Sequence, residues 1–140
     1  LLFFPLFSSV SYVCYNQLQA IPVPNNYEKG TLKMLSKDAK AVLYILYKEY
    51  LLRRKQGDSK SKARNFISAQ YIHSTFFSDW RLEDVEDTIR ELGRNNFLNN
   101  CYADNTIYHC ELSDLALVTM ENQKKETFLS IADFISKFIP

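Results

Sequence analysis

The sequence predicts a mainly helical α+β domain over residues 34–140, preceded by a separate segment at residues 1–33. Apolar residues recur at helical spacing after Ser36 and again after Arg81. Two short runs of strand-forming residues surround the pair Asp104 and Asn105. With 140 residues, of which 46% are hydrophobic and 14% aromatic, the chain has enough apolar mass for the core of one domain.

Residues 1–33 differ in composition from the rest, because no charged residue occurs before Glu28. A signal peptide would need a basic start and a cleavage site, and neither is present. A membrane anchor is the less favoured alternative, since a span needs roughly 20 mainly apolar residues and this run is interrupted by polar ones. A purine-rich stretch encoding Glu28 to Gly30 would lie where a bacterial ribosome-binding site sits. We therefore expect residues 1–33 to be wholly or partly translated upstream sequence, with the natural start at Met34.

The first helix of the domain is expected from Ser36 to about Arg54. Its core face consists of apolar residues at helical spacing, namely Ala39, Val42, Leu43, Leu46 and Tyr50. Two further apolar pairs lie on other sides, Ile45 with Leu52 and Tyr44 with Leu51. A helix of this kind is predicted to be contacted on more than one side.

Two more helices are predicted after an exposed basic loop at residues 55–64. Ser68 is expected to cap the second helix, with Tyr71, Ile72 and Phe76 facing inward. Ser78 or Asp79 is expected to cap the third, which carries a single apolar stripe and is expected to stop at Gly93. The stripe consists of Leu82, Val85, Ile89 and Leu92.

A β-hairpin follows, with a two-residue turn at Asp104 and Asn105. This turn would place Cys101 opposite Tyr108 and Cys110 opposite Asn99, so a bridge between the two cysteines is not expected. Together with Cys14 they make an odd number without CxxC spacing, which fits neither a disulfide framework nor a zinc site. A reducing, cytoplasmic compartment is the interpretation.

The chain is predicted to end in two helices, the first capped by Ser113 and reaching about Gln123. The last helix begins near Thr127 and has one strongly apolar face, which must be covered either by the first helix or by the same helix of a second chain. The predicted partner or dimer interface consists of Phe128, Ile131, Phe134, Ile135 and Phe138.

The order helix, helix, helix, hairpin resembles the winged-helix superfamily. The stretches LEDVEDTIRELGRNNFLNN and CELSDLALVTMEN are similar to the third helix, hairpin and following helix of small bacterial and phage winged-helix proteins, the YjcQ-like group among them. The resemblance implies a winged helix-turn-helix, a three-helix core plus β-hairpin wing, with additional C-terminal helices. It also implies a bacterial or phage DNA-binding regulator or accessory factor, often dimeric, with its third helix in the major groove of double-stranded DNA.

The charge of the chain does not fit the DNA-binding function that this resemblance implies. The chain has a net charge of only +1, and residues 78–93 hold six acidic and two basic residues, a net charge of −4 on the helix that should approach phosphates. The candidate DNA contacts are therefore scattered bases: Lys60, Lys62, Arg64, Arg81 and Arg90. The alternative function is a protein–protein interaction module that uses the acidic third helix or the apolar last helix. For the basic loop, a merely solvated surface is the simpler interpretation.

No enzyme site is expected. His73 and His109 are the only histidines and lie far from any cluster with metal-ligand spacing. The three glycines are too scattered for a phosphate-binding loop, and no activated nucleophile is visible. We expect no catalytic residue, cofactor, metal or small-molecule substrate, and no membrane association.

Overall fold

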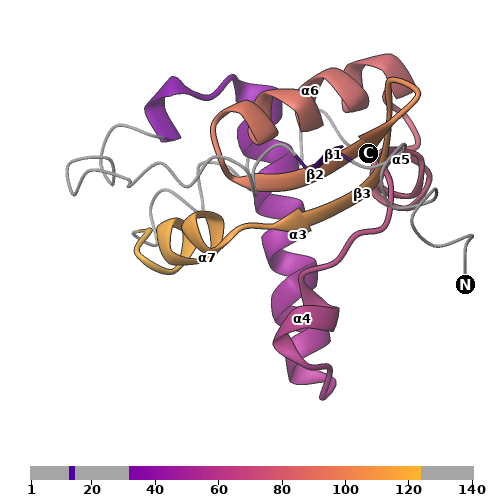
Figure 1. Ribbon diagram of the computed structural model, residues 1–140. Coiled ribbons are helices and arrows are strands. Elements are labelled where there is room, and N and C mark those ends of the chain that lie inside the picture. Colours follow the sequence, from indigo (N-terminus) through magenta and orange to yellow (C-terminus); the bar gives the residue numbers. More distant parts are fainter. Residues whose placement is uncertain (1–12, 15–31, 124–140) are drawn as a thin grey trace, which may run out of the picture.

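The computed structural model describes residues 13–14 and 32–123. Within these ranges the fold is α+β and mainly helical, with a small antiparallel sheet (Figure 1). The elements are β1 (Val13–Cys14), the 3-10 helix η1 (Leu32–Met34), α3 (Lys37–Lys55), α4 (Lys60–Ala63), α5 (Ala69–Phe76), α6 (Leu82–Arg94), β2 (Leu98–Ala103), β3 (Thr106–Leu112) and α7 (Asp114–Glu121).

Two predicted helix caps, Ser68 and Ser113, are confirmed, and the helix expected from Ser36 proves to be capped by that residue. The hydroxyl of Ser36 accepts a hydrogen bond from the amide of Ala39 at 3.1 Å, which begins α3. Ser68 caps α5 and Ser113 caps α7 in the same way. Each cap satisfies one amide that the helix itself leaves unpaired and contributes about 1 kcal/mol.

The predicted ends of the third helix were wrong. Neither Ser78 nor Asp79 caps α6, because its N-cap is Arg81, whose side chain makes no capping bond. Gly93 lies inside the helix rather than after it, and the left-handed residue that follows is Asn96, with φ 65°. Gly93 is needed for a different reason: a Cβ there would lie 2.5 Å from Nδ2 of Asn100.

The predicted loop at residues 55–64 also needs correction. Its second half forms the short helix α4, capped by Ser59, with Ala63 fully buried. Arg53 fixes this turn against α3, since its guanidinium donates to the carbonyl of Asn65 at 2.7 Å and lies over the ring of Phe66. The charged residues before Ala63 remain on the surface.

The sheet has the order β1-β2-β3, with antiparallel neighbours. The turn at Asp104 and Asn105 is confirmed, both residues having positive φ as such hairpin turns require. The predicted pairing beyond it was wrong, because a bulge between Cys101 and Tyr102 shifts the register. Cys101 therefore lies opposite His109, and Cys110 lies opposite Asn100.

The cysteines do not behave as their number indicated. Cys101 is disulfide-bonded, and in the backbone register Cys14 of β1 lies opposite it. Cys110 is a free, fully buried thiol, so the expectation that Cys101 and Cys110 are not bridged is confirmed. The expectation of a chain without a disulfide was wrong at Cys101. An odd number of cysteines does not exclude a disulfide, because three cysteines can still form one pair.

The core lies between α3, α5, α6 and the inner face of the hairpin. Its largest fully buried side chains include Phe66, Phe77 and Phe97. Figure 1 shows α3 running through the molecule, with α6 across one end and α4 beside the other. Within the described ranges, no helix combines the length and apolarity that crossing a membrane requires.

Candidate functional site

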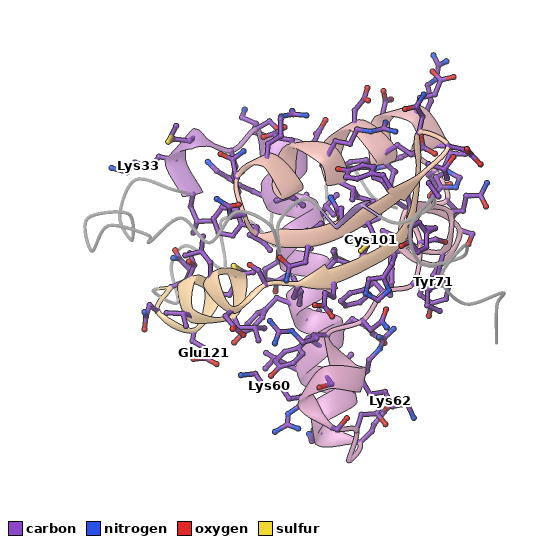
Figure 2. All side chains as sticks on the ribbon, viewed as in Figure 1. Lys33, Lys60, Lys62, Tyr71, Cys101 and Glu121 are labelled. Carbon is purple, nitrogen blue, oxygen red and sulfur yellow. The ribbon has the colours of Figure 1, made fainter. Side chains whose placement is uncertain are left out.

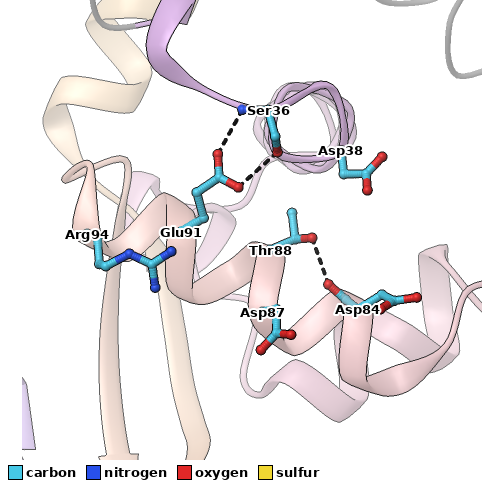
Figure 3. Close-up of a pocket in the computed structure, with 7 residues that line it drawn as sticks. All are labelled: Ser36, Asp38, Asp84, Asp87, Thr88, Glu91 and Arg94. Carbon is cyan, nitrogen blue, oxygen red and sulfur yellow. Dashed lines mark hydrogen bonds between the residues drawn. The ribbon is translucent and has the colours of Figure 1, made fainter.

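A hollow of about 390 Å³ lies between α6 and the first turn of α3 (Figure 3). It is lined by four carboxylates, two hydroxyls and one guanidinium: Asp38, Asp84, Asp87, Glu91, Ser36, Thr88 and Arg94. The hydroxyl of Thr88 donates to the backbone carbonyl of Asp84 at 2.7 Å. This bond does not involve the side-chain carboxylate of Asp84. The wall is therefore strongly acidic.

Glu91 is the member of this wall with a structural role. Its carboxylate accepts one hydrogen bond from the amide of Ser36 and one from the Ser36 hydroxyl, both at 2.8 Å. Figure 3 shows it reaching from α6 to the N-terminus of α3, where a negative charge also interacts favourably with the helix dipole. Glu91 thus holds α6 against α3 and fixes the floor of the hollow.

Asp84 and Asp87 are the exposed carboxylates that α6 contributes to this wall, and Asp38 and Arg94 are exposed beside them. Asp87 lies within 3.8 Å of the Arg90 guanidinium, but its side chain is 79% exposed, so the pairing is weak. Arg90 itself turns away toward the hairpin and donates to the carbonyl of Asn105 at 2.6 Å. Glu86 lies 3.8 Å from the same guanidinium. The only bases of α6 are Arg90 and Arg94, and Arg90 serves to hold the turn of the β2–β3 hairpin.

A second charged surface, the basic end, lies where α3 finishes and α4 follows. Its members are the exposed Arg54, Lys55, Lys60 and Lys62. Lys62 approaches Asp58 at 3.6 Å with its side chain 76% exposed. Figure 2 shows Lys60 and Lys62 beside α4, at the end of the molecule away from α6. The two charged surfaces therefore face different directions.

Arg64 does not belong to the basic end, although it was one of the predicted DNA contacts. Its side chain is only 15% exposed, and its Nε donates to the carbonyl of Leu112 at 2.7 Å. A second nitrogen contacts the carboxylate of Asp114 at 2.9 Å. Arg64 therefore ties the segment before α5 to the start of α7.

The five predicted DNA contacts consequently do not form one surface. Lys60 and Lys62 lie at the basic end, while Arg81 begins α6 and contacts Glu83 at 3.3 Å. Arg64 and Arg90 are engaged in contacts within the fold. The predicted interface at Phe128, Ile131, Phe134, Ile135 and Phe138 lies outside the described residues.

The hollow includes residues that the sequence reasoning did not single out, above all Asp38 and Arg94. Asp38 lies in the first turn of α3 and reaches the hollow only because Glu91 anchors that turn to α6. The contact between the two helices could not be predicted, because no sequence spacing relates residues 38 and 91. The sequence could have indicated only that Asp84, Asp87, Glu91 and Arg94 share one face of α6, since they recur at helical spacing.

The acidic wall is not arranged as a metal centre: among residues 32–123 no group of three or more potential His, Cys, Asp or Glu ligands is close enough to hold an ion. Comparison of the chain with protein-family models, with curated proteins and with solved structures gave no match.

Proposed function

We propose that this protein is a non-enzymatic winged-helix module that binds a basic segment of a protein partner along α6. The fold assignment rests on the element order α3, α5, α6 and the β2–β3 hairpin. It also rests on the bridge between Asn65 and Glu111, which adds a short strand position next to β3. In a winged helix the third helix is the element that faces the ligand. Here that element is α6.

The observation that carries the proposal is the acidic wall of the hollow beside α6. Four carboxylates and one guanidinium line it, and Arg90 is drawn away toward the hairpin. A surface of this sign repels the phosphates of a DNA groove, because DNA affinity comes largely from neutralising phosphates with bases. Lysine and arginine side chains of a protein partner have the complementary charge, which raises association rates and confers specificity.

The test is fluorescence anisotropy with a labelled oligoarginine peptide at low ionic strength. Replacing Asp84 and Asp87 together by Asn should weaken peptide binding and reduce its salt dependence, because both removed charges are exposed on the hollow. The matched control replaces Asp104 and Glu121, two exposed acids away from the hollow, by Asn and Gln. Equal losses in both variants would mean that the peptide senses only net charge, and this would refute a site at α6.

DNA binding is the second candidate, and the basic end favours it. Arg54, Lys55, Lys60 and Lys62 are all exposed there, with Asp58 as the nearby opposing charge. On this alternative a duplex docks on the α3–α4 end, and α6 stays away from the phosphates. Removing Lys60 and Lys62 should then flatten the slope of log affinity against log salt by up to about 2, since each phosphate contact gives roughly 0.9.

Arg64→Ala should not be combined with the Lys60 and Lys62 substitutions, because the Arg64 guanidinium contacts Leu112 and Asp114 within the fold. Its loss lowers affinity through folding rather than through phosphate contact. DNA is favoured over the peptide partner if the parent protein binds duplex DNA at low salt and two further results hold. Binding must be lost in Lys60→Ala/Lys62→Ala, and it must be kept in Asp84→Asn/Asp87→Asn.

We also propose that the protein is cytoplasmic and of bacterial or phage type. The disulfide at Cys101 is unusual for that compartment, where thiols are kept reduced. Titration of thiols in the denatured protein, purified without reductant, distinguishes the cases. One reactive thiol indicates an oxidised pair, and three indicate a reduced chain.

A further inference from the structure

The disulfide at Cys101 joins the hairpin to a strand that is distant in the sequence. Cys101 of β2 is disulfide-bonded, whereas Cys110 of β3 is a free thiol. The chain has three cysteines, so Cys14 is the one cysteine left within it to bond Cys101. The backbone register places Cys14 directly opposite Cys101. The bond therefore links β1 to β2.

The backbone pairing of β1 is short. β1 consists of Val13 and Cys14, which pair with Tyr102 and Cys101 of β2. Strands of globular proteins usually have about 3–10 residues, so a pairing of this length is weak by itself. The described core is built by α3, α5, α6, the hairpin and α7, which pack on one another. We therefore expect loss of the disulfide to release β1 and to leave this core intact.

β1 covers one edge of the sheet. The order β1-β2-β3 places β3 on one side of β2 and β1 on the other (Figure 1). The far side of β3 is met by the bridge between Asn65 and Glu111. Release of β1 would leave β2 as an edge strand, with unpaired backbone amide and carbonyl groups at Cys101 and Tyr102.

The neighbour of Cys101 on the other strand of the hairpin is a histidine. The register places His109 directly opposite Cys101, and side chains of such a pair share one face with Cβ atoms about 4.5–5.5 Å apart. Nε2 of His109 lies 3.9 Å from the carboxylate of Glu111, which provides a counter-charge for a protonated imidazole. A positive charge beside a cysteine stabilises its thiolate, and a stabilised thiolate leaves a disulfide faster.

We propose that Cys14 and Cys101 form a redox-controlled clamp, which a dithiol opens. One thiolate of the dithiol attacks the sulfur bonded to Cys101 and forms a mixed disulfide; the bond to Cys101 breaks, and the Cys101 thiolate takes up a proton. The second thiol of the dithiol then displaces Cys14, so two electrons and two protons pass from the dithiol to the protein. Cys101 is the leaving sulfur because it is only 6% exposed. Reduction releases β1 and opens the edge of β2.

The test compares the oxidised and the reduced full chain by hydrogen–deuterium exchange. In the oxidised protein the β2 amides that face β1 should be protected. After reduction by dithiothreitol they should exchange at least about tenfold faster, while the amides of α6 stay protected. Cys14→Ser should exchange like the reduced parent, with or without reductant. Cys110→Ala is the matched control, because it removes the free thiol and should behave like the parent in both states.

The rate of reduction tests the part of His109. It is followed as the appearance of two further thiols in each chain after dithiothreitol is added. His109→Gln should slow this rate at least about threefold, whereas His109→Lys, which keeps a positive charge, should largely preserve it. Protection of α6 in both variants shows that the fold is retained.

Four results would overturn the proposal in whole or in part. Equal exchange of β2 in the two redox states means that the disulfide does not hold β1. Loss of α6 protection on reduction, or in Cys14→Ser, means that the bond supports the whole fold. Three reactive thiols in the denatured protein, even after incubation with oxidised glutathione, mean that Cys14 and Cys101 do not pair. Equal rates of reduction in the parent and in His109→Gln remove His109 from the reaction.

Discussion

The contact between Gly93 and Asn100 provides the sharpest test of the packing. A Cβ added at Gly93 would lie 2.5 Å from Nδ2 and 3.5 Å from Cγ of Asn100. The Asn100 side chain has no room to retreat: it is 1% exposed, and its Nδ2 donates to the carbonyl of Ile89 at 3.1 Å. Gly93→Ala must therefore displace either the hairpin or this hydrogen bond.

The magnitude follows from three opposing contributions. Alanine is favoured over glycine inside a helix by about 1 kcal/mol. Overpacking a tight contact costs roughly 1 to 3 kcal/mol. Losing the bond from Asn100 to Ile89 leaves a buried donor unpaired, at a further cost of about 1 to 3 kcal/mol. We expect Gly93→Ala to lower the free energy of unfolding by about 1 to 5 kcal/mol, against its helix propensity.

Urea denaturation monitored by circular dichroism measures this change, and a double-mutant cycle assigns it. In an Asn100→Ala background the added methyl group meets no amide, so Gly93→Ala should become neutral or stabilising, with a coupling of at least about 1 kcal/mol. Gly57→Ala is the contrasting control: its φ is +102° and nothing lies within 4 Å, so its loss should persist in the Asn100→Ala background. A Gly93→Ala protein as stable as the parent would refute the reasoning.

Four further predictions follow from individual contacts. Glu91→Ala should lower the free energy of unfolding by about 1 to 2 kcal/mol in urea denaturation, because two charge-assisted bonds to the start of α3 are lost. Ile67→Asn should raise it by about 1 kcal/mol, since Ile67 is exposed with φ 65°, a conformation that costs a β-branched residue most. Burial raises the pKa of the Cys110 thiol above its ordinary value of 9.0. The folded state therefore holds this proton more tightly, and stability should be constant below about pH 9 and fall above it. Cys110→Ala should remove the part of the fall that begins near pH 9; a fall above about pH 10 remains, because burial also raises the pKa of Tyr47. A chain beginning at Met34 loses β1 and Leu32 but keeps every fully buried core residue that the structure describes, and it should show a cooperative thermal transition; a broad, non-cooperative one would contradict this.

Most of the secondary structure could be predicted because its signals are local. Ser36, Ser68 and Ser113 each precede an apolar helical pattern, and a serine hydroxyl at that position satisfies an amide regardless of what lies elsewhere. The turn at Asp104 and Asn105 is similarly decided by residues that tolerate positive φ. The helix start at Ser36, the caps at Ser68 and Ser113 and the turn were each confirmed.

The errors arose where a distant contact overrides a local signal. Gly93 has the sequence features of a helix stop, but it is retained inside α6 because Asn100 approaches it from the next strand. The bulge after Cys101 moves the hairpin register by one residue, which no count from the turn can detect. α4 forms because Arg53 holds the backbone of residues 63 and 65 from outside the segment.

The same distinction explains the candidate site. A count of bases placed Arg64 and Arg90 among the DNA contacts, yet a guanidinium has five donors and is well suited to tie backbone carbonyls together inside a fold. Arg64 holds Leu112, and Arg90 holds Asn105. Once these two are assigned to the fold, Arg54, Lys55, Lys60 and Lys62 form the exposed basic group at the α3–α4 end, while Arg81 and Arg94 are the exposed bases at α6. A partner that contacts α6 then meets more carboxylates than bases, so the sign of the partner's charge, rather than the fold it resembles, decides between protein and DNA.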